Sequence, residues 1–187
     1  KPLPDDLDRE LAIAVEAAAF DITRYSQRRT LEFNLIRGDA REAMQSLDKF
    51  DLSIFSPPYP NSFDYTDVYN IELWALGYLR SIDQNAKLRK STMRSHVQIK
   101  RDMSFHDLPD FVADTIERLR DEPKLWNPNI PDMIGAYFTD LRGILVDIRL
   151  ALPKNGRVYI VVGDSRYYGQ DILVAKGLAE MSSSLHF

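Results

Sequence analysis

The chain has 187 residues, no cysteine and a formal net charge of −4 at pH 7. This length suits one domain, and the lack of cysteine excludes disulfides, thiolate metal ligands and a cysteine nucleophile within it. No apolar run approaches the roughly 20 residues that span a bilayer. Because the N-terminal stretch is acidic where a secretory signal would be basic, we expect a cytoplasmic protein with no membrane partner.

The first 55 residues are expected to form a helix, a strand, a short helical connector and a second strand. Asp5 and Asp6 can cap a helix over residues 7–26, which is rich in alanine. In residues 31–38 alternate positions are apolar, which predicts a strand that ends at Gly38. Residues 40–47 follow as the connector, and residues 50–55, FDLSIF, read as the second strand.

The remaining chain alternates helical patterns with one more strand. Residues 157–164, RVYIVVGD, are nearly all apolar, as in a strand that is buried on both faces. Helices are predicted over residues 66–79, 107–119, 134–152 and 171–185, with a proline-rich loop at 122–132. The order of elements therefore indicates an α/β protein with a parallel sheet.

Polar or rigid segments come directly after the three predicted strands. They are Gly38-Asp39, Ser56-Pro57-Pro58-Tyr59 and Gly163-Asp164. Ligands of parallel sheets bind at the carboxyl ends of the strands, so these segments are expected at one binding rim. Asp164 is equally consistent with a simple turn or helix cap.

Ser56-Pro57-Pro58-Tyr59 after an apolar strand resembles the catalytic motif of the DNA amino-methyltransferases that use S-adenosylmethionine. Gly38-Asp39-Ala40 resembles the loop of that family whose acidic residue contacts the cofactor adenine, and residues 152–166 resemble the stretch that enters its fifth strand. The resemblance implies a Rossmann-like class I sheet, DNA as partner, and a place in restriction-modification. The serine form of the motif favours cytosine N4 over adenine N6 as the target.

The resemblance also implies how the motif works. The Ser56 hydroxyl and the Pro57 carbonyl would accept hydrogen bonds from the exocyclic amine, and Pro58 would keep them rigid. Tyr59 would stack on the flipped base. Methylation at cytosine C5 needs a cysteine nucleophile, so transfer to an exocyclic nitrogen is the consistent reaction.

A basic segment follows the predicted helix at 66–79 and lies in a helical insert, residues 79–131, where family members carry target-recognition elements. Basic residues there can contact phosphates even in an acidic protein, although a solvated face is the common alternative. Asn61, Asp64 and Tyr65 could line the base pocket or read a flanking nucleotide. The candidate nucleic-acid contacts are Asn61, Lys87, Arg89, Lys90, Arg94, Lys100 and Arg101.

The chain departs from the family pattern in more than one respect. No glycine-rich cofactor loop of the form Phe-x-Gly-x-Gly is found, and the acidic residue that usually holds the cofactor ribose at the end of the second strand is not evident. We therefore expect residues 1–187 to be a single, partial methyltransferase domain that is a fragment, is completed by a second copy or another segment, or is rearranged. A non-catalytic nucleic-acid-binding remnant and a methyltransferase acting on RNA are the alternatives. His96 and His106 lack metal-ligand spacing, and no metal is expected.

Overall fold

The computed structural model describes residues 4–28 and 32–187. The described parts of Lys1–Ile36 and of Arg37–Phe187 form two compact units. The first unit contains α1 (Pro4–Tyr25), where the predicted helix begins earlier than expected. Since the helix starts at Pro4, a residue favoured in the first helical turn, Asp5 and Asp6 lie inside it and the prediction that they precede it as caps is wrong.

The strand predicted at residues 31–38 is not formed. Residues 32–37 have no regular structure, Leu31 lies outside the described residues, and Phe33 and Leu35 are 86% and 85% exposed. A strand is stable only when its backbone groups pair with a neighbour. The alternating pattern is present in this segment, but its residues pair with no strand among those that the structure describes.

A two-stranded parallel sheet organises the second unit. β1 (Leu52–Phe55) pairs with β2 (Arg157–Ile160), and Phe55 lies opposite Ile160. Upstream of β1 the chain forms α2 (Ala40–Ala43) and a 3-10 turn, η1 (Met44–Ser46). This mixed α/β arrangement with a parallel pair agrees with the predicted fold class.

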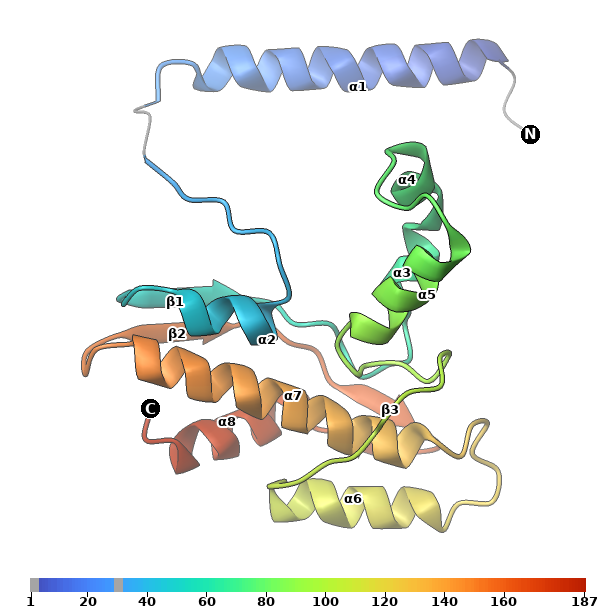
Figure 1. The fold of residues 1–187 in the computed structure, drawn as a ribbon, viewed down its shortest axis with the longest axis vertical. Helices are drawn as coiled ribbons and strands as arrows, with labels where there is room; N and C mark the ends of the chain where they lie inside the picture. The colour runs from blue at the N-terminus through green and yellow to red at the C-terminus, as the bar shows by residue number, and fades with distance from the viewer. Residues whose placement is uncertain (1–3, 29–31) are drawn as a thin grey trace. The chain divides into compact units, whose positions relative to one another are not determined.

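α7 (Ile130–Ala151) is the central helix of the unit and is buried along most of its length. Near its C-terminus, Ile144 and Ile148 pack against Phe55 and Val158 on one face of the sheet. Its N-terminal half packs against α6 (Asp110–Arg120) and α8 (Val174–Ser184), which lie alongside it in Figure 1. Within residues 4–28 and 32–187, no helix is both long and apolar enough to cross a membrane.

A β-hairpin separates β2 from α8. β3 (Ser165–Tyr167) pairs antiparallel with β4 (Gln170–Ile172). The two connecting residues, Tyr168 and Gly169, have φ angles of 45° and 79°, as two-residue hairpin turns require. The sequence predicted a helix from residue 171, so that helix starts later than expected and the hairpin was missed.

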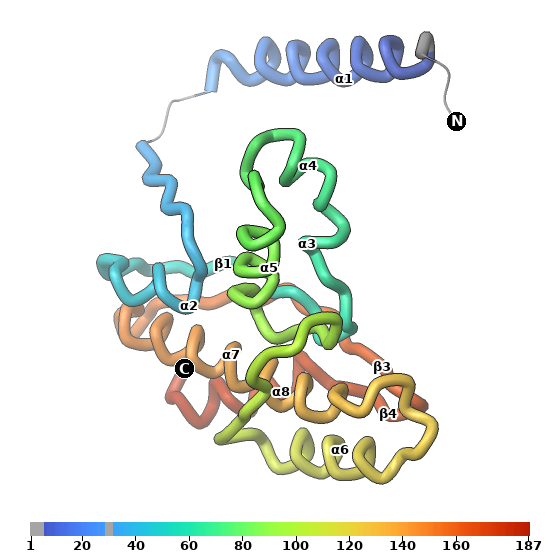
Figure 2. The backbone as a smooth tube through the Cα atoms, turned by 45° about the vertical axis from the view of Figure 1, so that its right-hand side comes forward, coloured from blue at the N-terminus to red at the C-terminus, as the bar shows by residue number. Residues whose placement is uncertain are grey.

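Three helices form an arm, residues 65–91, that stands apart from α6, α7 and α8 (Figure 2). They are α3 (Tyr65–Val68), α4 (Asn70–Ala75) and α5 (Ile82–Ser91). The single helix predicted at 66–79 is therefore two short helices, followed by Gly77 with a φ of 75°. Trp74 and Tyr78 in this arm are 38% and 56% exposed.

Candidate active site

A pocket of about 820 Å³ lies where the end of β1 meets the start of α2, the end of α5 and α7. It brings together Gly38, Asp39 and Ala40 with Ser56, Pro57 and Pro58, two segments that the sequence placed at one binding rim. The loop after α5 contributes further walls. The pocket is also lined by Tyr65, Leu88, Ser91, Thr92, Met93, Ser95 and His96.

The Ser56 side chain is exposed and has a fixed hydrogen-bond direction. Its hydroxyl donates to the carbonyl oxygen of Val161, just beyond β2, at 2.8 Å. Because the single hydroxyl proton is used there, the oxygen keeps its lone pairs as acceptors. The Pro57 carbonyl accepts no hydrogen bond from any residue that the structure describes, so Ser56 and Pro57, which follow β1 and line the pocket, each retain an unused acceptor.

Tyr59 and Tyr65 take different positions relative to the pocket. Tyr59 is half-buried and its ring lies against Gly163, where an added Cβ would be 3.3 Å from Tyr59 Cε2. Tyr59 is not among the residues that line the pocket, whereas Tyr65 is. The Tyr65 ring makes an edge contact with Phe63, with ring centroids 4.9 Å apart. Tyr65 is thus the tyrosine that lines the pocket, together with Phe55, whereas Tyr59 lies outside the lining.

Asp39 lies at the N-terminus of α2 and accepts a hydrogen bond from the backbone N–H of Arg41 at 3.0 Å. Both carboxylate oxygens also accept from the Arg41 guanidinium. These bonds lower the pKa of Asp39 despite its partial burial, so the carboxylate is charged at neutral pH. Gly38 and Ala40 flank it as exposed pocket residues.

The buried carboxylate of Asp140 on α7 joins two walls of the pocket. It accepts from Arg41 of α2 at 3.1 Å and from Arg94 of the loop after α5 at 2.7 Å. The side chain of Asp140 is 7% exposed, and buried carboxylates are stable only when paired. Arg94 also donates from Nη1 to the Ser104 carbonyl. All three nitrogens of its guanidinium therefore form hydrogen bonds within the protein.

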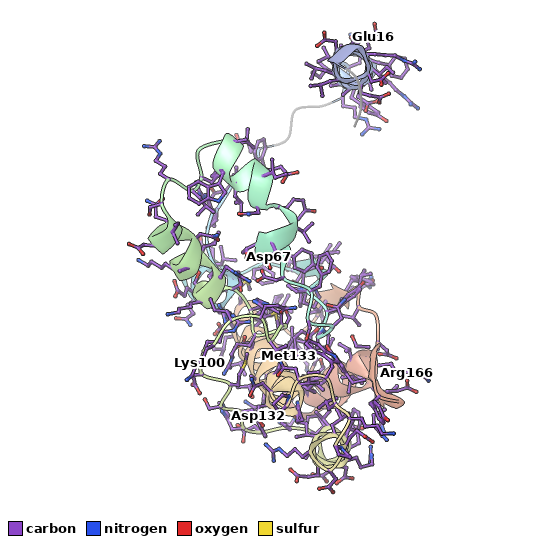
Figure 3. The ribbon with its side chains drawn as sticks, turned by 90° about the vertical axis from the view of Figure 1, so that its right-hand side faces the viewer. Glu16, Asp67, Lys100, Asp132, Met133 and Arg166 are labelled. Atoms are coloured by element: carbon purple, nitrogen blue, oxygen red, sulfur yellow. The ribbon has the colours of Figure 1, made fainter. Side chains whose placement is uncertain are left out.

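The other predicted nucleic-acid contacts divide into paired and exposed residues. Arg89 contacts Asp64 and Asp67, and Arg101 donates to the carbonyls of Thr92 and Met93, with burial lowering its pKa to about 10. Asp67 and Lys100 are labelled in Figure 3. Lys87, Lys90, Lys100 and Asn61 are exposed, which leaves the three lysines as the basic side chains best placed to contact phosphates.

Asp64 and His96 form a buried pair next to the pocket. Asp64 is 5% exposed and His96 is 1% exposed, and His96 Nε2 lies 3.5 Å from Asp64 Oδ2. Burial, reinforced by the charge of Arg101, lowers the pKa of His96. The sequence suggested that Asp64 could line the pocket but carried no signal for His96, because its partner Asp64 comes from a distant position in the chain.

Neither a metal centre nor a role for Asp164 is supported by the described side chains. In the part of the chain that the structure describes, no three His, Asp or Glu residues are grouped as a metal ion would need. Asp164 is exposed, and its carboxylate lies 3.5 Å from the backbone N–H of Ala175 near the start of α8. The N-cap residue of α8 is Leu173, so Asp164 makes only a long contact at this helix end.

Comparison with known proteins gave matches among curated sequences. The chain is 32% identical over 153 residues to the type II methyltransferase M.AvaI of Nostoc sp., and equally to the protein of that name from Anabaena variabilis. It is 26% identical over 163 residues to the type II methyltransferase M.BsoBI of Geobacillus stearothermophilus. No family model matches the chain, and no solved structure matches it.

The matches cover 75% of this chain but only 31% to 32% of each relative. The chain thus spans about a third of the length of the curated relatives that it matches. Because the other unit, Lys1–Ile36, is short, most of the matched residues must fall in the unit Arg37–Phe187, which contains the pocket. The chain therefore belongs, as a part, to the family of type II DNA methyltransferases.

Proposed function

We propose that this chain supplies the base-binding acceptors and the adenine end of the cofactor site of a DNA amino-methyltransferase, with cytosine N4 favoured over adenine N6. The observation that best supports this proposal is the hydrogen bond from the Ser56 hydroxyl to the Val161 carbonyl. It leaves the Ser56 oxygen free to accept, beside the Pro57 carbonyl, in the pocket that also holds Asp39.

The proposed chemistry follows from the two acceptors. The lone pair of an exocyclic amine is conjugated with its ring and is a poor nucleophile. If Ser56 Oγ and the Pro57 carbonyl each accept a hydrogen bond from the amine, they favour a tetrahedral nitrogen with its lone pair free. Acceptors that are fixed in advance stabilise the transition state without reorganisation, and the Pro57-Pro58 step restricts the backbone that carries them.

The described residues fit part of the expected cofactor. S-adenosylmethionine, when bound, supplies an electrophilic methyl group attached to sulfur. Asp39 is a charged acceptor on the pocket wall and could take a hydrogen bond from the adenine amine, while Gly38 and Ala40 leave the rim beside it open. The pocket volume of about 820 Å³ gives room for a nucleoside and a base together.

The proposed fold is a Rossmann-like sheet of which β1 and β2 are two neighbouring strands. Strands of parallel sheets are normally covered on both faces. Here α7 covers one face, whereas Leu52, Ile54 and Tyr159 on the other face are exposed. This exposed face supports a partial domain, completed by a complementary segment or a second copy, with residues 79–131 as a helical insert.

Calorimetric titration with S-adenosylmethionine tests the cofactor part of the proposal. We expect saturable binding to the wild-type chain that is weakened about tenfold, or 1.4 kcal/mol, by Asp39→Ala. Glu42→Ala in the same helix is the control, because Glu42 is exposed and does not line the pocket. No binding to the folded chain, or equal binding by both variants, would show that Asp39 does not contact the cofactor.

A further inference from the structure

We infer that Asp64, Arg89 and His96 form a positioning assembly that holds Tyr65 in place as an aromatic side chain lining the pocket that contains Ser56. The inference rests on the proposed function, because it assigns the assembly to the binding of a flat base. Tyr65 would touch the base, whereas the three assembly residues would act through it.

Asp64 is the centre of the assembly. Its Oδ1 accepts hydrogen bonds from the backbone N–H and the hydroxyl of Thr66, which makes Asp64 the N-cap of α3. Its Oδ2 accepts from Arg89 Nε at 2.9 Å and from Arg89 Nη2 at 2.7 Å. Since Tyr65 is the residue between Asp64 and Thr66, these bonds fix the backbone on both sides of its ring.

Arg89 connects Asp64 to α5, the last helix of the arm. It lies in the last turn of α5 and reaches Asp64 with two nitrogens of its guanidinium, a geometry that lysine cannot reproduce. The side chain of Asp64 is 2% exposed and that of Arg89 is 23% exposed. A pair that is this buried is not available to bind a phosphate group, and removing one partner would leave an uncompensated charge.

His96 completes the assembly from the loop after α5. Arg101 Nη2 lies 3.3 Å from His96 Nδ1, and because arginine is only a donor, Nδ1 must be the acceptor. The neutral ring therefore carries its proton on Nε2, which faces Asp64 Oδ2 at 3.5 Å. No closer acceptor is found for Nε2 among the described residues. The ring itself lines the pocket.

Further hydrogen bonds fasten the segment between Tyr59 and Tyr65. The backbone N–H of Ser62 donates to the Ser95 carbonyl at 3.1 Å, so this segment is attached to the residue before His96. On its other side the buried Tyr167 hydroxyl donates to the Pro60 carbonyl at 2.9 Å. The motif, the arm and the loop after α5 are thereby connected, and a change at Asp64 is expected to move Tyr65 relative to Ser56.

Titration with deoxycytidine monophosphate, followed by ligand-detected NMR, tests this inference on the intact chain. We expect Asp64→Asn and Arg89→Lys each to raise Kd about tenfold, which corresponds to 1.4 kcal/mol. Asp67→Asn is the matched control. Asp67 also contacts Arg89, but its side chain is 56% exposed, and exposed pairs contribute little. Lower unfolding midpoints with an unchanged Kd in both variants would overturn the inference.

Substitutions of His96 separate positioning from simple packing. Glutamine can donate a hydrogen bond toward Asp64 as the Nε2–H does, whereas phenylalanine fills a similar volume without a donor. We expect His96→Gln to retain most of the affinity for deoxycytidine monophosphate and His96→Phe to lose it. Equal affinity of the two variants would exclude His96 from the assembly.

Amide hydrogen exchange at Thr66 and Asp67 tests the assembly without any ligand. We expect faster exchange in Asp64→Asn and Arg89→Lys than in Asp67→Asn, because the cap of α3 is released. If the wild-type chain bound no nucleotide, the proposed function would be wrong. The exchange rates would still show whether Asp64 and Arg89 stabilise the cap of α3. Unchanged exchange in both variants would overturn the assembly itself.

Discussion

The hydroxyl of Ser56 donates a 2.8 Å hydrogen bond to the carbonyl of Val161, a residue 105 positions later in the chain. The bond exists because β1 and β2 are parallel neighbours and end at the same edge of the sheet. It turns the Ser56 oxygen from a donor into an acceptor toward the pocket. An amine presented there would therefore meet two acceptors, Ser56 Oγ and the Pro57 carbonyl.

The packing of Tyr59 on Gly163 leads to a first prediction. Gly163→Ala would place a methyl group 3.3 Å from Tyr59 Cε2, closer than most carbon–carbon contacts. We expect the Tyr59 ring to shift and the affinity for deoxycytidine monophosphate to fall severalfold, because Tyr59 directly follows Pro58, which lines the pocket. Gly143→Ala is the control, because no atom lies within 4 Å of the added group. NMR titration of both variants measures the difference.

The division of the basic residues leads to a second prediction. Replacing Lys87, Lys90 and Lys100 together with alanine should flatten the salt dependence of DNA binding, by a slope of about 0.9 for each DNA phosphate that the lysines no longer neutralise. Lys154→Ala, at an exposed position outside the insert, should leave the slope unchanged. Fluorescence anisotropy over a series of salt concentrations gives both slopes. An unaltered slope in the triple variant would mean that these lysines only solvate the surface.

Asp140 should be important for stability. Asp140→Asn leaves Arg41 and Arg94 without their shared buried carboxylate, and breaking a buried ion pair typically costs about 3–5 kcal/mol. Asp132→Asn breaks an exposed pair with Arg120, for which we expect about 1 kcal/mol or less. Urea unfolding of the two variants measures both changes in the free energy of unfolding. Similar changes would show that the Asp140 network does not hold the pocket walls together.

The pKa of His96 predicts how stability changes with pH. Burial lowers this pKa below 6.5 in the folded chain, so the unfolded chain binds the proton first as the pH falls. Stability should therefore be complete above about pH 6.5 and decline from there down to the folded pKa. Urea unfolding between pH 8 and pH 5 measures this decline. It should disappear in His96→Gln and persist in His106→Gln, whose parent side chain is exposed.

The parts of the fold that rest on strong local patterns were predicted from the sequence. The apolar runs of β1 and β2 and the long amphipathic pattern of α7 indicated an α/β protein, and the structure contains the parallel pair and the helix that covers it. The strand predicted at 31–38 is absent, because an alternating pattern shows what a strand would look like but not whether it has a neighbour. The β3–β4 hairpin was missed because its turn uses Tyr168, which rarely adopts a positive φ.

The sequence indicated which chain segments meet at the candidate site, but it did not indicate the ion pairs around that site. Gly38-Asp39-Ala40 and Ser56-Pro57-Pro58 were expected at one rim, and they line one pocket. The basic residues of the insert looked alike in the sequence, yet Arg89, Arg94 and Arg101 are used inside the protein. Their partners are set by tertiary packing, which a count of charges along the chain cannot reveal.

The most direct test of the central claim is a comparison of deoxycytidine monophosphate with thymidine monophosphate as ligands of the intact chain. Cytosine carries an amine at the position where thymine carries an oxygen, so two acceptors should favour cytosine. We predict binding of the cytosine nucleotide, weak or no binding of the thymine nucleotide, and loss of this preference in Ser56→Ala but not in Ser53→Ala. Equal binding of both nucleotides by the wild-type chain, or a preference that survives Ser56→Ala, would contradict the account.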